Sequence, residues 1–233
     1  ISNAEVISGI TIAQLRRRGT PVVWGSGSGP LDMKTMVATY SSPEFLLHSM
    51  AMSEMAHYYY HKPVWGFAGC SESKLPDIQA GIESALTVLW TMFSGANLIH
   101  DTGYLESGLT ASLEMMVVVD EIISFARRLM RGIEVSSETL ALDVIDKVGP
   151  GGSFLKTSHT MQNYRQVWYP RVFDRHNYSG WAQAGQPTAI SNAHQIARDA
   201  IANHHPVPIP EETIQKLNAI VAEANQRLGI GSI

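Results

Sequence analysis

The sequence repeats one pattern three times: a short apolar run, a turn rich in glycine or polar residues, and a long amphipathic segment. The apolar runs cover residues 20–24, 63–67 and 96–99, and the segments after them cover residues 43–60, 75–94 and 107–131. Short apolar runs predict strands, and apolar residues at three- and four-residue spacings predict helices. Strands that alternate with helices in this way indicate a parallel sheet.

Apolar side chains recur at helical spacing in two of the expected helices. Residues 75–94 carry them at Ile82, Leu86, Leu89 and Phe93, and residues 107–131 carry them at Leu113, Met116, Val117, Ile123, Leu129 and Met130. Side chains at this spacing share one face of a helix. We therefore expect each set to form the buried stripe of its helix, with Pro76 in the first turn of the earlier helix.

Short strands with polar tips and long helices fit a (β/α)8 barrel better than an open nucleotide-binding sheet. The open sheet predicts the fingerprint G-x-G-x-x-G, and Pro30 occupies the last glycine position of the loop that contains Gly25 and Gly27. The predicted fold class is therefore α/β, a (β/α)8 TIM barrel entered partway round. Residues 1–150 hold its C-terminal strand-helix units, and residues 151–233 form a helical C-terminal extension packed on the barrel.

The second part of the chain is less regular. A helix is expected over residues 136–148, with the serine pair at its start as N-cap and a Gly-Pro-Gly-Gly sequence after it. Residues 153–185 are rich in aromatic side chains and weakly periodic. Two closing helices are expected, over residues 189–203 and 211–228.

Composition argues against several classes of protein. The 233 residues carry a net charge of −4, so no large positive field attracts nucleic acid. No stretch approaches the roughly 18 consecutive apolar residues of a membrane span. Cys70 is the single cysteine, so no internal disulfide is possible, and a reducing, cytoplasmic location is expected.

His100 and Asp101 form the best catalytic candidate, because they follow the third apolar run directly. In a barrel, polar groups at the carboxyl ends of strands face the pocket. The histidine can bind a leaving amine or hold a carboxylate, and the aspartate can orient it. The alternative is structural: the histidine satisfies backbone groups of the loop, and the aspartate caps the next helix.

Aromatic residues lie on or beside the same strand tips, at Trp65, Phe67 and Tyr104. The faces of such rings attract a quaternary ammonium group, by about 0.5 to 2 kcal/mol per face. Spacing alone favours the alternative, in which these rings form ordinary barrel core. Trp168 and Trp181 are candidates to close an aromatic cage from the extension.

Two further sets are weaker candidates. Ser71 and Lys74 are near Cys70 in sequence, but a nucleophilic thiolate needs a base or a cation in space, so a structural or pocket-wall cysteine is favoured. His57 and His61 are one helical turn apart, on the same face as Glu54. The sequence H-E-x-x-H is absent, and no metal site is predicted.

Several segments together resemble the trimethylamine methyltransferase family, corrinoid-dependent enzymes that include glycine betaine methyltransferases. The match runs from the first residues to the last helix, and the segments keep their order and spacing. They are residues 3–5, 21–25, 65–74, 95–101, 104–106 and 148–152, with Asp77, Gln79, Ala80, Asp120 and Glu121. Members are about twice this length, so we expect this chain to be the C-terminal half of one.

The resemblance implies methyl transfer from a methylated amine to Co(I) of a corrinoid (cobalamin) carried by a separate protein. It adds Glu106 to His100 and Asp101 as catalytic candidates. The substrate-binding candidates are Trp65, Phe67, Tyr104, Cys70 and Ser71. Trimethylamine-specific members carry pyrrolysine in the barrel, and this sequence has no nonstandard residue, which favours a quaternary amine such as glycine betaine. The cofactor sits on the partner, so none is expected to bind this chain directly.

Two alternatives stay open. The barrel is a non-catalytic binder of betaine-like solutes, or an enzyme that uses His100 and Asp101 for acid–base chemistry on an unrelated small molecule. Aromatic and arginine residues of the extension are a candidate dock for the corrinoid protein, and packing on the barrel is the equal alternative for them. These residues are Tyr164, Arg165, Trp168, Arg171 and Arg175. A homo-oligomer is also expected.

Overall fold

The computed structural model describes residues 1–25 and 27–229; Ser26, in the glycine-rich turn, lies outside them. Its α-helices are α1 (Ser2–Arg16), α2 (Pro43–Glu54), α3 (Ile78–Phe93), α4 (Leu113–Met130), α5 (Ser137–Leu140), α6 (Leu142–Val148), α7 (Ser158–Asn163), α8 (Tyr178–Gln183), α9 (Ala189–Asn203) and α10 (Glu211–Leu228). Its strands are β1 (Trp24–Gly25), β2 (Leu31–Asp32), β3 (Val37–Ala38), β4 (Val64–Phe67), β5 (Leu98–His100), β6 (Tyr104–Leu105) and β7 (Thr110–Ala111). A π-helical turn, η1 (Met55–Tyr59), and three 3-10 turns, η2 (Glu106–Gly108), η3 (Phe154–Lys156) and η4 (Tyr164–Gln166), complete the elements.

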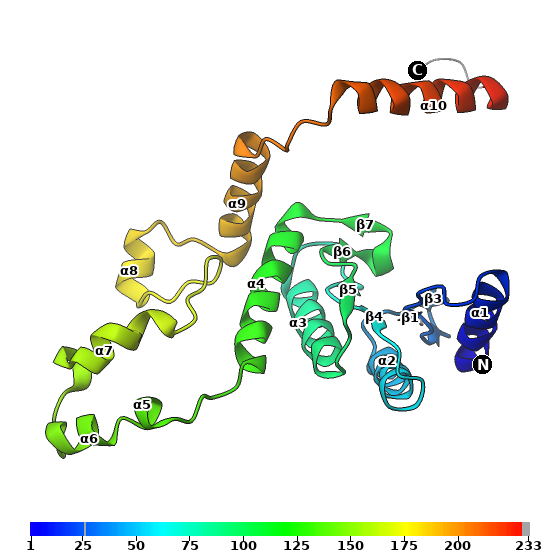
Figure 1. Ribbon diagram of the computed structural model, residues 1–233. Helices are drawn as coiled ribbons and strands as arrows, with labels where there is room; N and C mark the ends of the chain where they lie inside the picture. Colours follow the sequence, from blue (N-terminus) through cyan, green and yellow to red (C-terminus); the bar gives the residue numbers. More distant parts are fainter. Residues whose placement is uncertain (26, 230–233) are drawn as a thin grey trace. The chain divides into compact units, whose positions relative to one another are not determined.

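The expected parallel sheet is confirmed. Its strands lie in the order β1-β4-β5, and both pairs are parallel. Trp65 of β4 lies opposite Gly25 in β1 and Leu98 in β5, and Phe67 lies opposite His100. Because neighbouring strands follow one another along the chain, with α2 and α3 in the two crossovers, these are consecutive strand-helix units (Figure 1).

The two crossover helices and α4 each begin at a polar side chain. Ser42 accepts a hydrogen bond from the backbone N–H of the third residue of α2, Asp77 does so for α3, and Ser112 does so for α4. These side chains satisfy backbone donors that have no partner inside a helix. The helix expected over residues 43–60 is confirmed as α2 followed directly by the turn η1.

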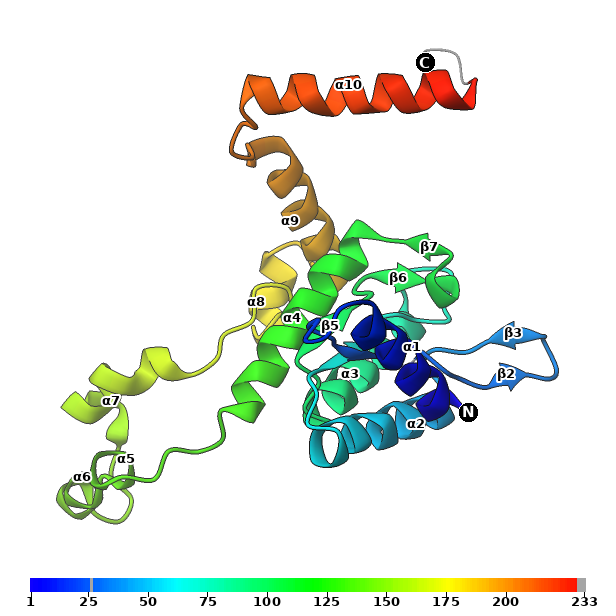
Figure 2. The same ribbon diagram turned by 45° about the vertical axis from the view of Figure 1, so that its right-hand side comes forward.

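The start predicted for the third helix is wrong. Residues 107–112 do not join α4, because Glu106 and Ser107 have left-handed φ values of 51° and 54° and lie in the tight connection between β6 and β7. The two strands pair as an antiparallel hairpin, and α4 begins after its cap, Ser112. The hairpin is visible beside the N-terminal end of α4 (Figure 2).

Other boundaries differ in smaller ways. The helix expected from residue 75 begins at Ile78, because Asp77 is extended and caps it, so Pro76 precedes the helix. The helix expected over residues 136–148 has its N-cap at Ser136 but breaks at Ala141, whose φ is 47°. In the first apolar run, residues 20–24, only Trp24 belongs to a strand, as the first residue of β1.

The buried face of α3 is not the predicted one. Of the four predicted residues, Leu89 packs at the edge of the core, but Ile82, Leu86 and Phe93 are about half exposed. Small and hydroxyl side chains occupy the buried positions instead: Ala80, Ser84, Thr87, Val88 and Thr91. The large apolar side chains therefore point away from the sheet.

Close packing of α3 on β4 explains this choice. A Cβ atom added to Gly66 would lie 2.5 Å from Thr91 Cγ2, so strand and helix approach at a distance that excludes large side chains. Hydroxyl groups of α3 also form hydrogen bonds with backbone groups at the end of β4. Thr91 donates to the carbonyl of Phe67 at 2.9 Å, and Thr87 accepts from the backbone N–H of Gly69 at 3.0 Å.

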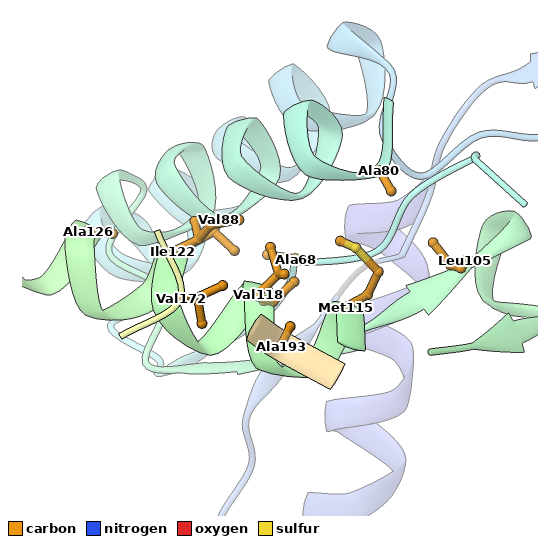
Figure 3. Packing of buried hydrophobic residues seen from close by; sticks show 11 residues of the cluster. Ala68, Ala80, Val88, Leu105, Met115, Val118, Ile122, Ala126, Val172 and Ala193 are labelled. Carbon is orange, nitrogen blue, oxygen red and sulfur yellow. The ribbon is translucent and has the colours of Figure 1, made fainter. Parts of the chain in front are cut away.

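The stripe predicted for α4 is also wrong for most of its members. Leu113, Met116, Leu129 and Met130 are about half exposed, while Val117 and Ile123 pack at the edge of the core. The side chains that α4 buries are Met115, Val118, Val119, Glu121, Ile122 and Ala126. All of these except Glu121 form the main cluster between β4, α3, α4 and α9, together with Ala68, Ala80, Val88, Leu105, Val172 and Ala193 (Figure 3).

A buried carboxylate ties the aromatic extension to α4. Glu121 is 1% exposed, and its Oε1 accepts hydrogen bonds from the backbone N–H groups of Arg171 at 2.6 Å and Val172 at 3.0 Å. The guanidinium of Arg171 also pairs with Asp120. Val172 is itself part of the main cluster. At least this part of the predicted extension therefore packs on the strand-helix units.

The chain divides into two compact units, residues 1–197 and residues 198–233. The boundary predicted near residue 150 lies inside the first unit and stays a prediction. The second unit contains α10, whose bounds are those expected from the sequence. Within the described residues, no helix has both the length and the apolar character needed to cross a membrane.

The contact at Gly66 generates a prediction. In the full-length protein, Gly66→Ala should lower the free energy of unfolding by about 1 to 3 kcal/mol, because the new methyl group overpacks the contact with Thr91. Gly81→Ala is the matched control. No atom lies within 4 Å of a Cβ at this position of α3, so alanine should stabilise the helix by roughly 0.5 to 1 kcal/mol. Urea unfolding measures both; equal effects of the two substitutions would contradict the packing argument.

Candidate functional site

The two faces of β4 differ in their surroundings. Val64 is buried and packs with Trp24 and residues of α2, and Gly66 contacts α3. Side chains alternate along a strand, so Trp65 and Phe67 lie on the opposite face. On this face Trp65 is 50% exposed and Leu98 of β5 is 52% exposed. The face that the helices do not cover is therefore lined by large apolar side chains that are open to solvent.

Three of the predicted site residues meet at the carboxyl end of this face. His100 is the last residue of β5, and its ring lies 5.3 Å from that of Trp65 and 5.2 Å from that of Phe67. Both contacts are edge-to-face, with interplanar angles of 89° and 78°. The parallel register produces this cluster, because it places Phe67 opposite His100.

Asp101 holds the histidine. Its Oδ1 lies 3.0 Å from His100 Nδ1, and the aspartate has a left-handed φ of 73°. That backbone conformation is uncommon for residues other than glycine, although aspartate tolerates it better than most. It turns the chain sharply after the strand. When Nδ1 donates to the carboxylate, Nε2 is left to interact with a ligand.

Two aromatic residues that were not predicted join the cluster. Tyr40 stacks on Phe67 with ring centroids 4.8 Å apart and an interplanar angle of 29°. Phe45, in the first turn of α2, makes edge contacts with both. No sequence signal marks these two residues, because they precede β4 by about twenty positions and belong to a loop and a helix.

A carboxylate network that was not predicted lies beneath the cluster. Glu83 of α3 accepts hydrogen bonds at Oε2 from the hydroxyl of Ser71 at 2.7 Å and from the backbone N–H of Glu72 at 2.8 Å. The carboxylate of Glu72 accepts from the backbone N–H of Tyr40 at 2.6 Å and from the hydroxyl of Ser107. The network therefore joins the loop after β4 to the loop before α2 and to the β6–β7 hairpin.

Cys70 and Ser71 lie below the surface. Cys70 is 1% exposed, and burial, followed by the negative charges of Glu72 and Asp101, raises the pKa of its thiol to about 12. A raised pKa keeps the thiol protonated and unreactive at neutral pH. Ser71 is fully buried and bound to Glu83, so in this structure both residues shape the loop and neither reaches the open surface.

Tyr104 and Glu106 lie in the neighbouring hairpin. The backbone carbonyl of Tyr104 accepts a hydrogen bond from Ser71, and its ring makes no contact with the aromatic cluster among the described residues. Glu106 is partly buried, with a φ of 51°, and its backbone N–H donates to the carbonyl of Ser73. Its carboxylate has no hydrogen bond or ion pair within the described chain.

The proposed closing tryptophans do not reach the cluster. Trp168 contacts Phe125 and donates to Ser124 on α4, and Trp181 donates to the carbonyl of Pro187. Trp168 packs on α4, while the side chains of Arg171 and Arg175 are exposed, so the dock predicted for this segment stays a prediction. A cavity of about 900 Å³ lies between α3, α4 and residues 168–190, and none of the residues of the aromatic cluster lines it.

The histidine pair considered for a metal has backbone partners. His57 Nε2 lies 3.0 Å from the carbonyl of Gly95, and His61 Nδ1 lies 3.2 Å from the carbonyl of His57. In the described ranges, no group of three or more histidine, cysteine, aspartate or glutamate side chains is arranged to hold a metal ion.

The burial of Cys70 predicts its reactivity. In the full-length native protein at pH 8, iodoacetamide should modify Cys70 at least about a hundredfold more slowly than after unfolding, because the folded thiol is protonated and covered. Mass spectrometry of the peptide that contains Cys70 measures the rate. The raised pKa also means that the thiol favours folding below about pH 9 and loses this contribution between about pH 9 and 12. Rapid native labelling would show that the thiol is accessible.

Comparisons with known proteins identify the family of the chain. A family model described as trimethylamine methyltransferase matches residues 1–229. The chain is 39% identical over 224 residues to a trimethylamine methyltransferase of Methanosarcina barkeri, covering 96% of this chain and 45% of that protein. It is 36% identical over 228 residues to a trimethylamine methyltransferase of Desulfitobacterium hafniense, covering 98% and 46%.

A relative that is named for another substrate has a similar identity. The chain is 35% identical over 231 residues to a glycine betaine methyltransferase of Desulfitobacterium hafniense, covering 98% of this chain and 48% of that protein. The chain thus spans about half the length of the curated relatives it matches.

Proposed function

Because the chain belongs to the trimethylamine methyltransferase family, we propose that it is part of an enzyme that transfers a methyl group from a methylated amine to Co(I) of a corrinoid protein. The observation that carries this proposal is the cluster of Trp65, Phe67 and His100 at the carboxyl ends of adjacent parallel strands. The activity belongs to the full-length protein, of which this chain supplies one side of the site.

A (β/α)8 barrel is the proposed complete fold. Parallel sheets are almost always covered on both faces, and here the face with Trp65 and Leu98 is half exposed. Helices already cover the other face. Further strands from the rest of the protein would close the sheet into a barrel and enclose these side chains. The site then lies at the carboxyl ends of the strands, where barrel enzymes have their active sites.

The aromatic cluster suits a substrate with a permanent positive charge. Ring faces attract methylated ammonium groups, and each desolvated contact contributes about 0.5 to 2 kcal/mol. The carboxylates of Asp101 and Glu106 are on the loops beside the cluster and add negative charge. These features support a quaternary amine such as glycine betaine as the substrate.

The chain's own residues have positioning roles in the proposed reaction. The aromatic rings hold the methylated nitrogen so that one methyl group points out of the pocket, and they exclude water from it. His100, oriented by Asp101, lies beside the substrate and can donate a proton to the departing amine after the C–N bond breaks. The carbon–nitrogen electron pair stays on the nitrogen, which leaves as an uncharged tertiary amine group and becomes an ammonium group when it takes the proton from His100.

The residues at the strand tips fit a cofactor that a partner protein brings. When bound, the corrinoid supplies the nucleophile that accepts the methyl group. A partner-borne group requires a substrate that is reachable from outside, and the carboxyl ends of barrel strands open toward the surface. The homo-oligomer predicted from the sequence stays a prediction.

Calorimetric titration of the full-length protein tests the pocket. Trp65→Ala and His100→Ala should each weaken glycine betaine binding by about tenfold or more, because each removes a ring that faces the cation. Trp90→Ala is the matched control. Trp90 lies on the outer face of α3 with a similar exposed fraction of 45%, so its loss should leave betaine affinity unchanged.

The outcomes separate the possible functions. Betaine binding with methyl transfer to the Co(I) corrinoid protein would support the proposal. A preference for trimethylamine over betaine would change the proposed substrate but not the proposed reaction. Saturable betaine binding without any methyl transfer would favour a non-catalytic solute binder. If no methylated amine bound, a quaternary amine pocket at these strand tips would be ruled out.

A further inference from the structure

A second pocket, of about 450 Å³, lies beside the C-terminal half of α4 and is rich in positive charge. One wall comes from α4 and the other from the segment around η4. Five arginines and one carboxylate contribute to its lining: Arg127, Arg128, Arg131, Arg165, Arg171 and Asp120. The chain as a whole has a net charge of −4, so this concentration is local.

Specific contacts hold the two walls of this pocket in place. The backbone N–H of Arg171 donates to the buried carboxylate of Glu121 at 2.6 Å. The indole N–H of Trp168 donates to the hydroxyl of Ser124 at 2.9 Å. The segment is therefore bonded to α4 on the same side as the arginines, which gives the pocket a defined shape in the free protein.

The carboxylates near the pocket already pair with one of its arginines. Asp120 and Glu121 both interact with Arg171. Arg128 donates to the carbonyl of Gly132, and Arg165 donates to the hydroxyl of its neighbour Tyr164. Both of these acceptors are uncharged, so they do not neutralise the two guanidinium groups.

Two more arginines lack even a neutral acceptor. The guanidinium groups of Arg127 and Arg131 have no hydrogen bond or ion pair to any described residue. Basic residues in the last turn of α4 complement the helix dipole, by about 0.3 to 1 kcal/mol each. The dipole does not explain Arg165, which faces the helix from another segment. Like charges gathered in one pocket repel each other, and a bound anion would remove that cost.

We propose that this pocket binds the phosphate group of a small phosphorylated molecule. Planar guanidinium groups bind phosphate oxygens in pairs, and several of them around one pocket favour an anion with more than one negative charge. The volume exceeds the needs of a bare phosphate ion, and Val167 and Trp168 add an apolar part to the lining that suits an organic body. The ligand class is therefore an organic phosphate.

The phosphate site is separate from the strand-tip cluster. The cluster's loops lead into the N-terminal end of α4 at Ser112, and Arg131 follows the last residue of the helix. At a rise of about 1.5 Å per residue, the helix places the two ends roughly 27 Å apart. Binding at this pocket is thus measured independently of methyl transfer, and either proposal can fail without the other.

Titration of the full-length protein with pyrophosphate, ATP, inorganic phosphate and citrate at low ionic strength tests the inference. We expect saturable binding of pyrophosphate and ATP that weakens as sodium chloride is added. The double substitution Arg127→Gln with Arg131→Gln should weaken this binding at least about tenfold. Arg16→Gln with Arg18→Gln removes the same charge from exposed positions of the N-terminal segment and should leave binding unchanged.

A second variant on the opposite wall keeps the test decisive. Arg165→Gln should also weaken pyrophosphate binding. This single variant still tests the site if the double variant has a lowered Tm and is too unstable to interpret. Equal weakening in the Arg16 and Arg18 control would mean non-specific attraction and overturn the site. Equal affinity for citrate would overturn the phosphate assignment, and no binding of pyrophosphate or ATP at millimolar concentration would overturn the proposal.

Discussion

Residues of β4 alternate between a helix-covered face and an open face, and the arrangement of the candidate site depends on this alternation. Gly66 allows α3 to approach the strand so closely that small and hydroxyl side chains fill the interface. The neighbouring positions, Trp65 and Phe67, must then point to the other side. Parallel pairing with β5 brings His100 to the same side and the same end of the sheet. One packing contact on the helix side thus orients the aromatic cluster on the other.

The loops at the strand tips are held by polar contacts rather than by apolar burial. Hydroxyl groups of α3 bond to the end of β4, and the carboxylates of Glu72 and Glu83 gather backbone and hydroxyl donors from three loops. Left-handed residues such as Asp101 are uncommon and cost about 1 to 3 kcal/mol each in general. Such a network offsets that cost, and it is consistent with a site whose groups must be in position before a substrate arrives.

The sequence predicted that four residues of the candidate site lie together at the strand tips, but it did not predict the other members. Strand tips in an alternating pattern identify His100, Asp101, Trp65 and Phe67 as neighbours, because parallel strands place their carboxyl ends at one edge. Tyr40 and Glu83 join them through tertiary contacts that no local pattern encodes. The prediction of which helix faces are buried was wrong for a related reason. Both α3 and α4 carry apolar residues on more than one side, so periodicity could not identify which side meets the sheet.

The sequence by itself determined the three successive strand-helix units, their parallel sheet, the N-cap at Ser136 and the family resemblance, because these depend on local spacing and residue type. Tertiary structure decided which helix faces are buried, that Cys70 is covered and protonated, and that arginines from α4 and from the η4 region line one pocket. These properties depend on the distance between segments far apart in the chain. Only the packed fold sets that distance, through contacts such as those of Gly66 with α3 and Glu121 with the extension.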